Sequence, residues 1–190
     1  MPLGDFGSTT KPQAAFARSG AGLGLDCSER FPHDFETGAM LLVDVQPTDG
    51  DALGATAAAI LRQYGIPSDP FVISATSWRI AWVLGKAGYA PRLREHLNAS
   101  LDLYFGALYG RFPRISLIAA PPNASASGRQ QPWIGMAAGA GAGLRFRNHY
   151  MVQFVYLSGI DQPAWYGEQV ATSHPTVSAL HATLGYVFGH

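Results

Sequence analysis

Apolar and polar residues alternate along much of this chain with a period of two, as they do in a β-strand whose side chains point to two different faces. The segment 97–110 is the longest example, because Leu101, Leu103 and Phe105 share one face while Asp102 and Tyr104 share the other. The same alternation recurs at residues 17–26, 39–46, 72–84, 134–146, 150–156 and 180–188. These segments predict seven antiparallel strands joined by turns and loops.

An eighth strand has two candidates. Residues 52–64 alternate well enough to form one, with a turn over 47–51 before it. Residues 51–64 also satisfy the rules for a short helix, since Asp51 is a suitable N-cap, Gly65 a suitable C′ residue, and Pro67 follows. If 51–64 is a helix, residues 115–120 must supply the strand. We favour the strand at 52–64, because 115–120 is too short to cross a bilayer at a tilt.

Composition narrows the class of protein. A length of 190 residues suits a single domain, so we treat 1–190 as one unit. Only 14% of the residues are charged and the formal net charge is zero, which argues against a nucleic-acid-binding surface. Glycine (22 residues) and aromatic residues (12%) are abundant, as in membrane β-barrels. The first residues resemble no signal peptide; we assume that one has been removed.

The polar faces of the predicted strands carry charges of both signs. In an all-β, eight-stranded, up-and-down transmembrane barrel, the apolar faces contact lipid and the polar faces line a narrow lumen that side chains can fill. We therefore expect an internal network of paired charges that holds the strands in register. Its predicted members are Arg18, Asp26, Asp44, Arg62, Arg79, Asp102, Arg145 and His181.

The C-terminal third resembles a known family. The segment 132–147 (PWIGMAAGAGAGLRFR), the turn after it, the strand 150–156 (YMVQFVY) and the end 184–188 (LGYVF) are similar to the small OmpA-like and opacity-type barrels. The resemblance implies a monomeric outer-membrane barrel that acts as an anchor, an adhesin or a minor pore. Its partners would be outer-membrane lipid, including lipopolysaccharide, and an external molecule bound by its loops. The chain departs from the family in that Gly189 and His190 follow the terminal aromatic Phe188.

Three other functions remain open: a small solute channel, a lipid A-modifying enzyme, and a soluble lipocalin-like binder with its apolar face inward. For the enzyme, Ser158 is the candidate nucleophile, with Asp161, Glu168 and His174 near it in sequence. Tyr156 stands where the deacylase barrels carry a histidine, so we expect no catalytic site. The six histidines show no metal-binding spacing, and we expect neither a metal nor another cofactor.

Overall fold

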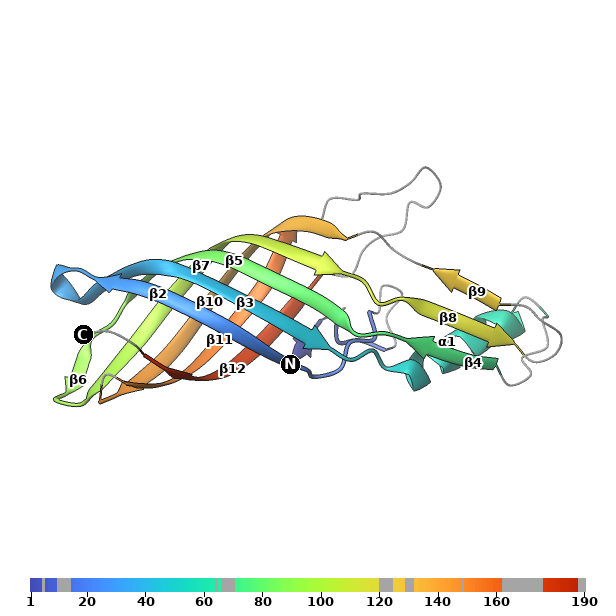
Figure 1. Cartoon of the computed structure of the whole chain (residues 1–190), viewed down its shortest axis with the longest axis horizontal. Helices are drawn as coiled ribbons and strands as arrows, with labels where there is room; N and C mark the ends of the chain where they lie inside the picture. The colour runs from blue at the N-terminus through green and yellow to red at the C-terminus, as the bar shows by residue number, and fades with distance from the viewer. Residues whose placement is uncertain are drawn as a thin grey trace.

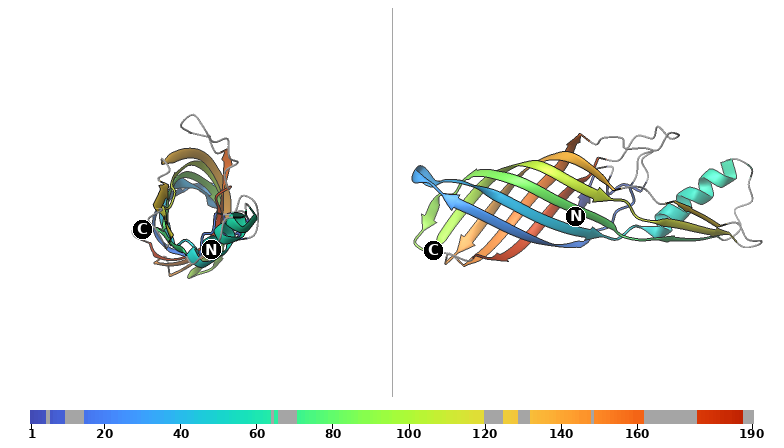
Figure 2. Two further views of the ribbon diagram at one scale, coloured as in Figure 1. Left: turned by 90° about the vertical axis from the view of Figure 1, so that its right-hand side faces the viewer. Right: turned by 45° about the horizontal axis from the view of Figure 1, so that its top comes forward.

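The computed structural model describes residues 1–4, 6–9, 15–63, 65, 71–119, 125–128, 132–147, 149–161 and 176–187. Most of them belong to one antiparallel sheet that curls around an interior, as the end-on view of Figure 2 shows. The strand order is β1-β12-β11-β10-β7-β5-β3-β2, and the short β6 pairs with β7. These strands are β1 (Pro2–Leu3), β2 (Ala21–Arg30), β3 (Phe35–Gln46), β5 (Trp78–Tyr89), β6 (Arg92–Arg94), β7 (Leu97–Arg111), β10 (Trp133–Phe146), β11 (Tyr150–Asp161) and β12 (Ser178–Tyr186).

A second, smaller sheet extends from one end of the curled sheet (Figure 1). It contains β4 (Phe71–Ala75), β8 (Ile115–Ala119) and β9 (Ser125–Gly128) in the order β4-β8-β9. Only residues 76–77 separate β4 from β5, and only 112–114 separate β7 from β8, so the extension continues the β5–β7 hairpin. The helix α1 (Gly50–Gln63) lies at this same end, which we call the helix end. A 3-10 turn, η1 (Pro32–Asp34), joins β2 to β3 at the opposite end.

The strand prediction for residues 52–64 is wrong, and the helix alternative is correct. The N-cap is Asp49 rather than the predicted Asp51: its side chain accepts a hydrogen bond from the Ala52 amide (3.0 Å), and its carbonyl accepts one from Leu53 (3.0 Å). The alanine-rich body of α1 favours this outcome locally. Residues 115–119 do form a strand, but β8 belongs to the small sheet and not to the curled one.

The outer surface of the curled sheet is apolar. On β7, Leu101, Leu103 and Phe105 are 63%, 68% and 56% exposed, while Asp102 between them is 3% exposed. The same arrangement continues on the neighbouring strands. Large exposed apolar residues there include Leu23, Leu25, Leu41, Val43, Val45, Val83, Ile134, Met136, Leu144, Phe154, Ile160, Leu180 and Leu184. The predicted arrangement, with apolar side chains outside and ionic ones inside, therefore holds for β7.

On β5 the predicted assignment of faces is wrong. Trp78, Ile80, Trp82 and Leu84 are buried and point inward, which leaves Arg79 exposed on the outer side. These large side chains fill the interior toward the helix end. Their apolar surface is buried there, which stabilises the fold. The strand also continues to Tyr89, beyond the predicted end at Leu84.

One glycine is required for this packing. Gly110 on β7 pairs with Trp133 on β10, and the indole of Trp133 lies directly over it. A Cβ atom at residue 110 would overlap the ring, so glycine lets the large side chain cross to the neighbouring strand.

Candidate functional site

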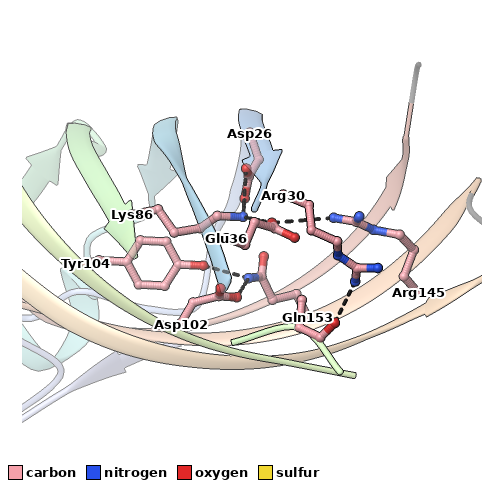
Figure 3. Close-up of polar contacts among 9 residues, drawn as sticks. Asp26, Arg30, Glu36, Lys86, Asp102, Tyr104, Arg145 and Gln153 are labelled. Carbon is pink, nitrogen blue, oxygen red and sulfur yellow. Dashed lines mark hydrogen bonds and ion pairs between the residues drawn. The ribbon is translucent and has the colours of Figure 1, made fainter. Parts of the chain in front are cut away.

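The candidate site is a group of charged and polar side chains inside the curled sheet, drawn in Figure 3. At its centre Lys86 of β5 points inward, and its side chain is 2% exposed. Its Nζ donates to both oxygens of Asp26 (3.0 and 3.1 Å) and to Oε1 of Glu36 (2.8 Å). One buried cation is thus shared by carboxylates from β2 and β3, so three strands are joined through a single ammonium group.

Two arginines extend this group. Arg145 on β10 lies 3.7 Å from Glu36 of β3, so this ion pair spans the interior between strands that are not neighbours in the sheet. Arg30 at the end of β2 donates to the carbonyl of Ala90 (2.6 Å). Glu36 therefore has a cation on two sides, which compensates for its removal from water.

A second group of polar side chains, which includes the carboxyl group of Asp102, adjoins the first. The Gln153 amide nitrogen donates to Oδ2 of Asp102 (3.1 Å) and to the Tyr104 hydroxyl oxygen (2.6 Å). All three residues are buried, and they come from β11 and β7. Oδ1 of Asp102 has no hydrogen-bond partner among the described residues. Asp102 is thus held by an amide, whereas the predicted network consisted of paired charges.

A further contact joins β12 to β3, which lie next to the two ends of the strand order. Nδ1 of His181 on β12 lies 3.5 Å from Oδ1 of Asp44 on β3, and the Trp82 indole donates to Oδ2 of Asp44 (2.8 Å). The His181 and Trp82 rings meet edge to face, 6.2 Å apart. β3 and β12 are not neighbours in the sheet, so this contact spans the interior.

Toward the helix end, an aromatic layer (Phe6, Trp78, Phe112 and Trp133) fills the interior. Phe6 is fully buried against Trp78 with ring centroids 5.2 Å apart, and Trp78 contacts Phe112 at 4.9 Å. The Trp78 indole donates to the carbonyl of Ala15 (3.1 Å), so the chain before β2 is anchored inside this end. The arrangement is that of a packed core rather than an aqueous channel.

The structure brings five of the eight predicted site residues into the interior: Asp26, Asp44, Asp102, Arg145 and His181. The other three are arginines outside it. Arg18 is 56% exposed and pairs with Asp49 (2.9 Å) at the start of α1. Arg62 is exposed on α1, because 52–64 is a helix. Arg79 is exposed on the outer face of β5, for the reason given above.

Sequence reasoning missed Glu36 and Lys86, which lie at the centre of the network. Both fell outside the predicted strands, which began at residue 39 and ended at residue 84. The signal was present, since Lys86 continues the two-residue spacing of Trp82 and Leu84, and Glu36 that of Met40 and Leu42.

Of the candidate catalytic residues, Ser158 is the one whose side-chain contacts the structure describes. The Ser158 hydroxyl lies 2.9 Å from that of Ser178 and donates to the Gly159 carbonyl. Glu168 and His174 lie outside the described residues.

No group of three or more potential metal ligands occurs among the residues that the structure describes. None of the described helices has the length and hydropathy needed to span a membrane.

None of the protein-family models, curated protein sequences or solved structures compared with the chain matches it.

Proposed function

We propose that this protein is a small outer-membrane β-barrel of eight strands whose interior is filled by side chains, with a structural or surface-interaction role. The observation that carries the proposal is the inverted distribution of polarity. Exposed Leu, Val, Phe and Ile side chains cover the outside of the sheet, while a paired set of ions lies within. A water-soluble barrel needs the opposite distribution, so the lipocalin-like alternative has little support.

The dimensions of the apolar surface support the same reading. On β7 the outward side chains are apolar from Leu97 to Tyr109 and end at the exposed Arg111. Twelve residue steps of about 3.3 Å span about 40 Å along the strand. A strand tilted by about 40° would then cover about 30 Å of membrane thickness, close to the hydrocarbon core of a bilayer.

Charges on the outer face occur where such a band would end. Arg79 and Arg111 are directly opposite each other on β5 and β7, and both are exposed at the helix end. Like charges in facing positions are unfavourable unless an anion lies between them. In an outer membrane, the phosphates of lipopolysaccharide would supply that anion. We therefore place the helix end on the cell exterior, where α1 and the β4-β8-β9 sheet are available to external partners.

The filled interior favours an anchor or adhesin over a channel. Trp82, Leu84 and Leu108 have almost no exposure, and the aromatic layer occupies the helix end. We expect the protein to be a monomer without a cofactor, and we propose no enzymatic activity, since among the described residues the Ser158 hydroxyl contacts a second serine.

The test is expression with a cleavable signal peptide, followed by membrane fractionation and gel migration with and without boiling. We expect the protein in the outer-membrane fraction, soluble only with detergent, and faster migration of the unboiled form. A monodisperse protein in detergent-free buffer, with identical migration before and after boiling, would refute the proposal.

A further inference from the structure

A small pocket lies at the end of the curled sheet where η1 joins β2 to β3, which we call the η1 end. The residues that line it come from the ends of several strands, among them β2, β3, β7 and β10. Its polar lining consists of Arg30, Glu36, Asn98, Ser100 and Arg145. The aromatic layer fills the opposite end, so the interior is apolar at the helix end and carries two cations at the η1 end.

Glu36 is the carboxylate that lines this pocket, and it is held mainly by Lys86. Its Oε1 accepts a hydrogen bond from the Lys86 ammonium group at 2.8 Å, whereas Nη2 of Arg145 lies 3.7 Å from the same oxygen. A close hydrogen bond between a cation and a carboxylate measures about 2.7–2.9 Å. The Arg145 guanidinium is therefore only loosely paired with Glu36, and a closer acceptor can bind it.

The second cation of the pocket is Arg30 at the end of β2. Its hydrogen bond to the Ala90 carbonyl (2.6 Å) uses one of the five N–H groups of a guanidinium. Figure 3 draws this guanidinium next to that of Arg145, on the side of Glu36 that faces away from Lys86. Two like charges that line one small pocket repel each other, and an anion between them would turn the repulsion into attraction.

The charges around the pocket favour an anion for a second reason. Three cations and two carboxylates lie together at this end: Arg30, Lys86, Arg145, Asp26 and Glu36. The next carboxylate, that of Asp102, accepts a hydrogen bond from Gln153 and does not line the pocket. One further negative charge between the two arginines would balance the charges at the η1 end.

We propose that this pocket binds a small oxyanion, a phosphate or a carboxylate group, between Arg30 and Arg145. Planar guanidinium groups bind both kinds of anion through pairs of parallel hydrogen bonds. The side chains of Asn98 and Ser100 supply neutral polar groups on the same wall. The pocket is small, so it fits one such group, either as a free ion or as the end of a larger molecule. The site goes beyond the structural role proposed above and does not depend on lipid.

The test is titration of the folded 190-residue protein with inorganic phosphate in non-ionic maltoside micelles, which contain neither phosphate nor carboxylate. Binding is followed by the width of the phosphorus NMR signal, and chloride keeps the ionic strength constant because salt screens exposed charges. We expect saturable binding of phosphate and its displacement by acetate. Binding that rises without saturation, or that acetate does not reduce, would overturn the proposal.

Variants locate the bound anion. We expect Arg30→Gln and Arg145→Gln each to weaken phosphate binding at least about tenfold, since each removes a charged donor. Arg94→Gln is the matched control, because Arg94 is exposed on β6 at the same end and does not line the pocket; we expect a change below about twofold. Equal losses in all three variants would show attraction to surface charge alone. Unchanged binding in Arg30→Gln would place the anion elsewhere, and either result would overturn the proposal.

Arg30→Lys separates a shaped site from simple positive charge. Lysine keeps the charge at residue 30 but lacks the planar fork, so we expect this variant to bind phosphate as weakly as Arg30→Gln. Binding equal to that of the parent protein would overturn the proposal. Titration with glycerol 3-phosphate then distinguishes the source: affinity at or above that of inorganic phosphate supports the end of a larger molecule, and lower affinity supports a free ion. These readings are made in micelles, so their failure is distinct from a failure to find the protein in the outer membrane.

Discussion

Replacement of Lys86 by methionine keeps most of the buried stem of this side chain and removes its charge. The change leaves the carboxylates of Asp26 and Glu36 without the ammonium group that lies 3.0 and 2.8 Å from them. At an effective dielectric constant of about 20, each contact corresponds to about 5–6 kcal/mol of Coulomb energy. Desolvation offsets much of this, and removal of one partner from a buried ion pair costs about 3–5 kcal/mol. We expect Lys86→Met to lower the free energy of unfolding by that amount.

The assay is urea unfolding of the folded protein in detergent, followed by tryptophan fluorescence, because Trp82 lies in the same interior. Arg79→Met is the matched control: it also removes a cation from β5, but from the exposed outer face, and we expect a change below about 0.5 kcal/mol. The double variant Lys86→Met/Glu36→Gln should recover part of the loss, since it removes one orphaned charge. A Lys86→Met protein as stable as the Arg79→Met control would refute the account of the network.

Three further variants test other parts of the structure. Asp102→Ala leaves the amide of Gln153 with the Tyr104 hydroxyl alone, so we expect a loss of about 1–3 kcal/mol in the same urea assay, and an unchanged midpoint would contradict the assignment of this hydrogen bond. Phe6→Ala removes a fully buried ring from the aromatic layer; we expect a loss of about 3–5 kcal/mol and a new, low conductance in planar bilayers, and a stable, non-conducting variant would show that Phe6 does not seal this end. Asp49→Ala removes the N-cap of α1, and we expect a loss of about 1 kcal/mol together with lower helicity by circular dichroism. The Ala52 amide and Arg18 hold the pKa of Asp49 below its usual value, so its contribution is present at neutral pH and is lost as the pH falls through that lowered pKa; helicity that is equally acid-sensitive without the carboxylate would exclude this cap as the cause.

The sequence pattern was most informative where one face of a strand is uniformly apolar and the other carries ions. This was so on β7, where Leu103 and Asp102 were assigned to the correct faces. It failed on β5, because Trp78 and Trp82 fill the interior and an apolar face therefore did not mark the outside. Periodicity identifies two faces of a strand, but the packing partners decide which one is buried.

The internal network was only partly predictable for a similar reason. Local pattern gave Asp26, Asp44 and Arg145, but the pairing of Lys86 with Glu36 depends on register between strands fifty residues apart in sequence. The helix at 50–63 was wrongly predicted as a strand, because strand and helix templates both fit an alanine-rich segment. The N-cap is Asp49, two residues before the predicted Asp51. Arg18 and the Ala52 amide both bind the Asp49 carboxylate.

The central claim is that the outer face of the curled sheet contacts lipid, and nitroxide scanning along β7 tests it most directly. In a Cys27→Ser background, single cysteines at residues 101 to 105 are spin-labelled, and the protein is reconstituted into bilayers. The account predicts that labels at Leu101, Leu103 and Phe105 collide often with dissolved oxygen and rarely with a water-soluble nickel complex, whereas labels at Asp102 and Tyr104 are shielded from both. Frequent collision with the nickel complex at 101, 103 and 105 would place this face in water and contradict the account.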